Sequence, residues 1–323
     1  MIHLIYHNDP DGYLSGYIAS QYFKQKTDKI KYYSIDHGNN FPLFISEIDE
    51  HLSNKQRIGR KDVVCLMDFS LKPDVMQSLF REIGLQQANL IWIDHHKTVL
   101  EQDYGNFNCF VDSIKNKMGK DEPVLNGILQ VGKGACELTW EYFNGDKVKP
   151  KVVSLVSQFD TWQEKGMFDW EEVVMPTMAF ISGMNANPKH KDADTIWQEL
   201  FDNHKKYIKL GKTLQQYRDN LNAQNMHSYA VEKIIYHDDE RYRAITINSC
   251  DRGSRAFQSV YDPAKHDLML VYVCLKNGMF SVSLYSDKID VSRIAKKYNG
   301  GGHTGAAGFI TTWSALMNFL ERT

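Results

Sequence analysis

Residues 91–96 read Ile-Trp-Ile-Asp-His-His, an apolar run that ends abruptly in one carboxylate and two imidazoles. A short apolar run between polar residues is typical of a buried strand. Open α/β sheets hold their ligands just beyond the carboxyl ends of such strands. We therefore interpret Asp94, His95 and His96 as the centre of a metal site. In the alternative interpretation, Asp94 caps a following helix and both histidines are ordinary surface residues.

The amino terminus shows the same pattern. Residues 2–6 are a strand candidate that leads directly into the motif HNDPDG at positions 7–12, before a helical pattern begins. Proline and glycine in this motif indicate a tight turn. Such a turn at a strand end lets alternate residues face one point, so His7, Asp9 and Asp11 can converge on an ion. The alternative is that the two aspartates only cap the helix.

A further strand candidate, residues 62–67, ends at Asp68. Strand and helix patterns alternate through this part of the chain, which predicts a parallel sheet. The carboxyl ends of parallel strands lie at one edge of a sheet, so the polar groups that follow them become neighbours in space. The expected strands are residues 2–6, 29–34, 62–67 and 89–93, and the expected helices are residues 41–52 and 72–83.

Two more helices are expected at residues 134–143 and 152–159. The first has an apolar face, which favours a role in core packing. The second ends at Asp160, whose carboxylate either reaches the same metal site or is a solvated helix terminus.

The sequence predicts an α/β protein with three parts. A parallel-sheet domain with flanking helices covers residues 1–193, a helical connector covers residues 194–228, and a smaller α/β domain covers residues 229–323. Apolar residues spaced by three and four predict one or two connecting helices, and an amphipathic homodimer surface is the alternative function of this stripe. The last domain is expected to hold strands at residues 242–248, 268–274 and 280–285 and helices at residues 255–261 and 291–297.

A glycine run, GGGHTGAAG, occupies positions 300–308. Residues without side chains let backbone amides approach a ligand closely. We therefore predict that Gly301, Gly302 and His303 contact substrate. A flexible glycine-rich turn is the alternative.

Composition limits the class of protein. The 323 residues are 42% hydrophobic and 24% charged, as in ordinary globular chains. The start of the chain lacks a basic leader, and no apolar run approaches the roughly 18 residues of a spanning helix, so we expect no membrane role. The five cysteines form no CxxC pair, which argues against a disulfide framework and a structural zinc cluster and favours a cytoplasmic protein. A net charge of -2 argues against long nucleic acid as a partner and favours a small phosphorylated substrate.

The combination of motifs resembles the DHH phosphoesterase family, in particular its nanoRNase or oligoribonuclease-type and bisphosphate phosphatase members. The likeness covers nearly the whole chain, including the glycine run, which matches the signature of the DHH-associated C-terminal domain. The motifs that carry it are HNDPDG, Asp68, Asp94-His95-His96, Asp160 and GGGHTGAAG.

This resemblance implies a pair of divalent ions, usually manganese, with magnesium or cobalt as alternatives. The ligands carried over from the family are His7, Asp11, Asp68, His95 and Asp160, with Asp68 bridging both ions. The resemblance also implies that His96 faces substrate phosphate and that Asp94 orients a histidine. Asp68, Asp94, His95 and His96 are thus the expected catalytic residues.

Two positions depart from the family pattern. Many relatives have an aspartate where this chain has Tyr13, so either Asp9 replaces that ligand or a water does. Similar domains often have arginine at the position of Tyr285, and we expect Arg252 or Arg255 to supply the missing phosphate contact.

We therefore expect a metal-dependent phosphohydrolase that cleaves short oligonucleotides, dinucleotides or nucleoside bisphosphates through water activated by two metals. A pyrophosphatase or exopolyphosphatase is the second hypothesis, because the same kind of metal site serves both reactions. Base stacking on Phe257 or Tyr285 would favour nucleotides. The third hypothesis is a catalytically silent nucleotide-sensing module, for which loss of a metal ligand would be the mark.

Overall fold

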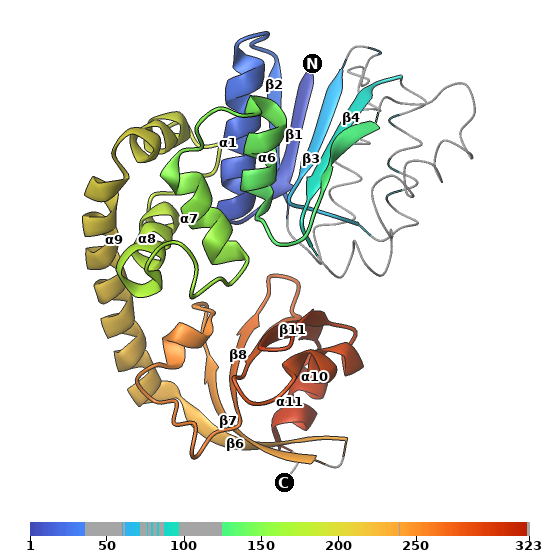
Figure 1. Ribbon diagram of the computed structural model, residues 1–323. Coiled ribbons are helices and arrows are strands. Elements are labelled where there is room, and N and C mark those ends of the chain that lie inside the picture. Colours follow the sequence, from blue (N-terminus) through green and yellow to red (C-terminus); the bar gives the residue numbers. More distant parts are fainter. Residues whose placement is uncertain are drawn as a thin grey trace. The chain divides into compact units, whose positions relative to one another are not determined.

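The computed structural model describes residues 1–35, 60, 62–71, 76, 79, 83, 87–96, 125–238 and 240–321, without the side chains of His303 and Glu321. These residues belong to two compact units, Met1–Leu214 and Gln215–Thr323, which we call the first and the second unit. Figure 1 shows the elements of each. The helix expected at residues 41–52 lies outside the described residues. Of the helix expected at residues 72–83, the three described positions are helical.

The first unit is built on a five-stranded sheet in which every neighbouring pair is parallel. This confirms the predicted α/β class. The strand order is β2-β1-β3-β4-β5, and the fifth strand was not predicted. The strands are β1 (Ile2–His7), β2 (Ile30–Ile35), β3 (Val63–Met67), β4 (Asn89–Asp94) and β5 (Leu125–Leu129).

Both faces of this sheet are covered, which explains why its strands read as continuous apolar runs. In β3, Val64 and Leu66 belong to one buried cluster, whereas Cys65 and Met67 belong to another. Helices α1 (Pro10–Lys24) and α6 (Ala135–Asn144) lie side by side over the second of these faces (Figure 1). Glycine at position 16 is needed there, because a Cβ atom would lie 2.7 Å from the ring of Tyr6.

The other described helices of the first unit either pack with α1 and α6 in a further buried cluster around Trp197 or, like the π-helix η1, contact helices of that cluster. They are α7 (Lys151–Asp160), the π-helix η1 (Trp170–Val174), α8 (Met175–Gly183) and the start of α9 (Ala193–Tyr229). α9 covers the range expected for the connector and has a non-helical residue, Asn203, within it.

The second unit holds a six-stranded mixed sheet in the order β10-β11-β9-β8-β7-β6. Its strands are β6 (Val231–His237), β7 (Glu240–Asn248), β8 (Leu268–Cys274), β9 (Phe280–Tyr285), β10 (Gly301–His303) and β11 (Ala306–Thr311). Besides the end of α9, its described helices are η2 (Ser254–Phe257), α10 (Val291–Lys297) and α11 (Trp313–Glu321). The helix expected at residues 255–261 is therefore only the short 3-10 helix η2. Among the described helices of both units, none combines the length and apolar character needed to cross a bilayer.

Candidate metal centre

Three adjacent strands end at the same level of the first sheet. Tyr6 pairs with Met67, and Met67 pairs with Ile93. The residues that come next along these strands are His7, Asp68 and Asp94. Parallel pairing therefore brings the three predicted motifs to one edge, as the pattern of strand ends indicated.

Asp68 lies at the middle of this edge. Its backbone has a φ of 55°, a left-handed conformation that aspartate adopts more readily than most residues, and its amide donates to the carbonyl of Ile93 at 2.9 Å. The side chain is buried. Its Oδ2 lies 3.7 Å from Nδ1 of His7, while its Oδ1 lies 3.3 Å from Nε2 of His95. The two oxygens of one carboxylate thus face two different histidines.

On the Oδ2 side, His7, Asp9 and Asp68 form a first group of potential ligands, whose ligand atoms lie within 4.8 Å of one another. Nδ1 of His7 lies 2.6 Å from Oδ2 of Asp9. The hydroxyl of Tyr13 instead donates to Oδ1 of Asn8 at 2.7 Å. In this geometry Asp9, rather than Tyr13, belongs to the candidate metal centre.

On the Oδ1 side, Asp11, His95 and Asp160 form a second group of the same kind. Nε2 of His95 lies 3.0 Å from Oδ2 of Asp160 and 3.6 Å from Oδ2 of Asp11. Asp160 is the last residue of α7, so this helix delivers its carboxylate to the site. The structure therefore brings together all six residues that we predicted as metal ligands.

Asp11 is held by helix α6, whose apolar face predicts a role in core packing. The backbone amides of Ala135 and Cys136, at the start of α6, donate to its two carboxylate oxygens at 2.6 and 2.8 Å. Helix amino termini favour negative charge, so α6 stabilises this buried carboxylate. A Cβ atom at position 134 would lie 3.2 Å from both oxygens of Asp11, which explains the glycine there. Small residues directly before a helix were the available sequence signal.

A second close approach shapes the first motif. A Cβ atom at position 12 would lie 2.2 Å from the carbonyl oxygen of His7, so Gly12 is required for α1 to begin directly against the end of β1. Asp9 caps the same helix, because its Oδ1 accepts from the amide of Gly12 at 2.9 Å.

Asp94 holds His96 in place. Its Oδ1 lies 2.7 Å from Nδ1 of His96 and accepts from the amide of His95 at 2.7 Å, while the hydroxyl of Ser70 donates to its Oδ2. These contacts engage both oxygens, so we interpret Asp94 as an orienting group and not as a metal ligand. Ser70 was not identified from the sequence, since a single serine after Asp68 carries no motif.

The charges of the centre test whether it fits a pair of divalent ions. Burial and the charges of Asp68 and Asp160 raise the pKa of Asp11 well above its usual value, and burial and the charge of Asp9 raise the pKa of Asp68. Burial opposes protonation of His95, but Asp160, Asp68 and Asp11 raise its pKa to about 12. Neighbouring carboxylates contribute to each of these shifts, so a cation bound among them would relieve their mutual repulsion.

The donor set fits as well. Asp9, Asp11, Asp68 and Asp160 carry four negative charges, which two divalent cations balance, while two histidines add neutral nitrogen ligands. Both oxygens of Asp68 and Nε2 of His95 are buried and have no partner with hydrogen-bond geometry among the described residues. Carboxylate oxygens with imidazole nitrogens suit manganese, magnesium or cobalt.

The residues of the second unit that we predicted to bind substrate differ from one another in exposure and in contacts. Arg252 is exposed, whereas the guanidinium of Arg255 donates to Asp219 at 2.9 and 3.0 Å. Phe257 is fully buried in the core of the second unit, so of the two aromatic residues considered for base stacking it is excluded. Tyr285 is partly buried against the same cluster.

The glycine run forms a hairpin, β10 and β11, rather than a flexible turn. Gly302 has a φ of 138°, and a Cβ atom there would lie 2.6 Å from Ala306, so the fold requires this glycine. Gly301 is exposed, and a Cβ atom there would meet nothing within 4 Å. The side chain of His303 lies outside the described part of the chain.

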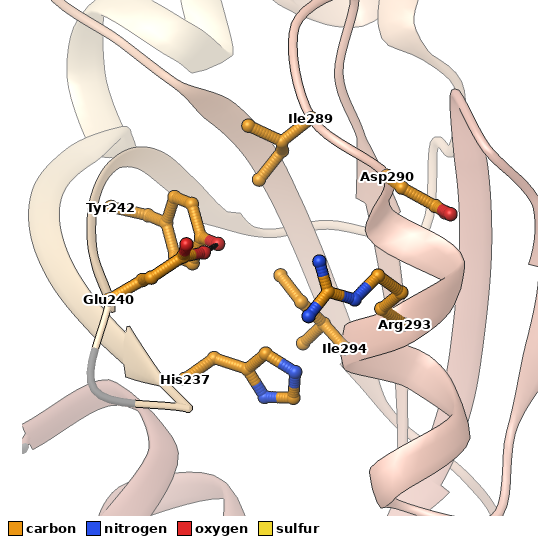
Figure 2. A pocket seen from close by; sticks show the side chains of 7 residues that line it. All are labelled: His237, Glu240, Tyr242, Ile289, Asp290, Arg293 and Ile294. Atoms are coloured by element: carbon orange, nitrogen blue, oxygen red, sulfur yellow. Dashed lines mark hydrogen bonds between the residues drawn. The ribbon is translucent and has the colours of Figure 1, made fainter.

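A small pocket of about 180 Å³ in the second unit contains none of the predicted site residues. His237, Tyr242 and Arg293 line it, and the hydroxyl of Tyr242 donates to the carboxylate of Glu240 within it (Figure 2). Ile294, which also lines this pocket, precedes the glycine run by six residues, and the pocket includes no residue of that run.

Two known proteins are similar to this chain in sequence. No family model matches the sequence. The chain is 25% identical to the uncharacterized protein R106 of Acanthamoeba polyphaga mimivirus, over 92% of this chain and 64% of that protein. It is 24% identical to the oligoribonuclease NrnB of Bacillus subtilis strain 168, over 97% of this chain and 73% of that protein. These similarities agree with the resemblance of the motifs to the DHH phosphoesterase family.

A solved structure has a similar fold. RecJ from Thermus thermophilus, in complex with Mn2+, has a TM-score of 0.52 and 13% identity, and the match covers 98% of this chain and 50% of that one. The two chains thus share a fold.

Proposed function

We propose that this protein is a manganese-dependent phosphodiesterase that cleaves short oligonucleotides, dinucleotides or nucleoside bisphosphates. The observation that carries the proposal is the position of Asp68, whose two oxygens face two separate groups of ligands. The names of two similar proteins agree with it, since one is an oligoribonuclease and the other was solved with Mn2+.

The chain's own residues have distinct tasks in this proposal. His7, Asp9 and Asp68 would hold one ion, and Asp11, His95 and Asp160 would hold the other, with Asp68 shared. Bound divalent ions would polarise the phosphoryl oxygens and lower the pKa of water at the site. His96 is half-buried, and the carboxylate of Asp94 fixes its ring through Nδ1. We propose that the opposite nitrogen, Nε2, contacts the phosphate.

Charge supports a short substrate. With a net charge of -2, the protein can neutralise only a few phosphates. The logarithm of substrate affinity should then fall with the logarithm of salt concentration at a slope of about -1 to -3, at roughly 0.7 per phosphate contacted on a single strand. Oligomers of two to four nucleotides should be cleaved faster than 20-mers.

The test is a substrate panel with controlled metal content. The protein is stripped with a chelator and reloaded with manganese, magnesium or cobalt, and each form is assayed on dinucleotides, a nucleoside bisphosphate, a 20-mer, pyrophosphate and polyphosphate. We expect chelation to abolish turnover, manganese to restore it best, and the short nucleotides to be preferred.

Other outcomes would favour other functions. Preference for pyrophosphate or polyphosphate would replace the proposed substrate class, and nucleotide binding without turnover in any metal would indicate a sensing module. Processive degradation of the 20-mer with a steep salt dependence would contradict the short-substrate proposal. The homodimer stays a prediction. Three large apolar residues of α9 are exposed and would be available to such an interface: Leu210, Leu214 and Tyr217.

A further inference from the structure

Trp162 is an exposed aromatic residue just after α7. Its side chain is 56% exposed, and its backbone has a φ of 53°. The amide of Trp162 donates to the carbonyl of Phe159, and the amide of Gln163 donates to the carbonyl of Gln158. This pair of bonds is the Schellman arrangement, in which the left-handed residue after the helix is usually glycine.

Tryptophan is a costly choice at this position. A side chain with a Cβ atom disfavours the left-handed conformation, and an exposed indole gains little from burial. Strained backbone of this kind is concentrated at ligand-binding and active sites, where function retains it. Neither the helix end nor the core of the first unit therefore explains the residue.

The ring of Trp162 is supported from behind. It stacks on Trp170 with ring centroids 6.3 Å apart and planes 29° apart, and Trp170 stacks on Phe159 at 5.7 Å and 15°. Phe159 packs against the buried cluster of helices, and Trp170 begins the π-helix η1. This series of three rings fixes the orientation of the outermost indole, and it leaves a large part of that indole exposed to solvent.

The backbone of Trp162 lies near the candidate metal centre. Trp162 follows the metal-ligand candidate Asp160 by two residues, so their Cα atoms are at most about 7 Å apart. A nucleotide carries its base one sugar away from its phosphate. A phosphate held at the metal centre therefore places its own or a neighbouring base within reach of this ring.

We propose that Trp162 is the stacking platform for a nucleobase of the substrate. This inference rests on the proposed function and deepens it, because it selects nucleotides over pyrophosphate and polyphosphate. Every base offers a π-face, so the platform would accept different bases. An exposed aromatic patch for a partner protein is the competing explanation.

The decisive variant is Trp162→Gly, because glycine adopts the left-handed conformation without strain and so keeps the helix end intact. We expect an unchanged or higher Tm together with a KM for a dinucleotide that rises about 5- to 150-fold, the range for loss of one stacked base. The KM for an abasic analogue with the same sugar-phosphate backbone should not change. Trp162→Phe should restore most of the dinucleotide affinity.

Trp313→Ala is the matched control, because Trp313 is 55% exposed and belongs to the second unit. It should leave both KM values unchanged. The proposal for Trp162 would be overturned if Trp162→Gly raised KM equally for the dinucleotide and the abasic analogue, or raised neither. The proposed function would still stand in that case, provided that the wild-type protein cleaves the dinucleotide. A large fall in Tm for Trp162→Gly would also overturn it, since the indole would then be structural. If the wild-type protein cleaves no nucleotide at all, the proposed function itself fails.

Discussion

Oδ2 of Asp9 lies 2.6 Å from Nδ1 of His7, while Oδ1 of the same carboxylate caps helix α1. The two interpretations of Asp9 that the sequence left open are therefore compatible. One oxygen starts the helix, and the other faces the candidate metal centre.

This division predicts the effect of Asp9→Asn. Asparagine caps helices as well as aspartate does, so the Tm should stay near that of the wild type. Loss of the negative charge should weaken manganese binding at least about tenfold, as changes around metal ligands commonly do. Tyr13→Phe is the control, because the Tyr13 hydroxyl donates to Asn8. Equal weakening in both variants, measured by metal titration, would instead assign the phenol a direct role.

Asp68→Ala should be the most damaging single carboxylate change. A shared ligand supports both ions, whereas water can replace a terminal ligand such as Asp160. Because metal stabilisation of the transition state is worth several kcal/mol, we expect turnover to fall at least about 100-fold. Elemental analysis after dialysis should also show loss of bound metal. Asp192→Ala, at an exposed carboxylate of the same unit, should change neither quantity, and two retained ions in Asp68→Ala would refute the assignment.

The two glycines of β10 should respond differently to alanine. Gly302→Ala places a Cβ atom 2.6 Å from Ala306 in a left-handed backbone, so we expect a loss of about 1–3 kcal/mol in the free energy of unfolding. Gly301→Ala meets no neighbour within 4 Å and should keep the wild-type Tm. If Gly301 contacts substrate, its alanine variant should raise KM without lowering stability. An unchanged KM would remove Gly301 from the predicted substrate site.

His3 predicts a pH dependence of stability that is separate from the metal centre. Burial lowers the pKa of His3 to about 4, against an opposing effect of Asp62. His3 therefore binds a proton only near pH 4 in the folded state, whereas it binds one near pH 6.5 in the unfolded state. The associated stability is present above pH 6.5 and is lost as the pH falls towards 4, by about 1–2 kcal/mol after allowance for solvent screening.

His3→Gln removes this titration and isolates its effect. Urea denaturation at pH 7 and pH 4.5 should show a larger loss of unfolding free energy for the wild type than for the variant. His227→Gln, at a histidine of α9, should behave like the wild type. Parallel losses in the wild type and in His3→Gln would show that His3 does not carry the effect.

Sequence patterns located the elements whose side chains alternate or repeat clearly. The expected bounds of β8, β9 and α10 agree with the structure residue for residue. The convergence of His7, Asp68 and Asp94 could also be predicted, because strand ends of a parallel sheet share one edge.

Features that depend on backbone contacts could not be predicted from the sequence pattern. β5 has no alternating pattern, and its Gly127 is required because a Cβ atom would lie 1.8 Å from the carbonyl oxygen of Trp92. The amides that hold Asp11 belong to Ala135 and Cys136. Almost every residue type has a backbone N–H group, so the sequence does not show which residues donate. The sequence could not separate Phe257 from Tyr285 as a stacking residue, because aromatic side chains occur both in cores and at binding surfaces.

The bonds that hold Asp11 also bear on how the protein is made. Its two donors come 124 and 125 residues later in the chain. At roughly 5–20 residues per second, a ribosome needs about 6 to 25 seconds to make that intervening length. During this interval the nascent amino terminus already contains the first motif but lacks the helix that stabilises its buried carboxylate. Tight metal capture should therefore begin only after α6 has emerged and docked, which keeps a half-made chain from trapping an ion in an incomplete site.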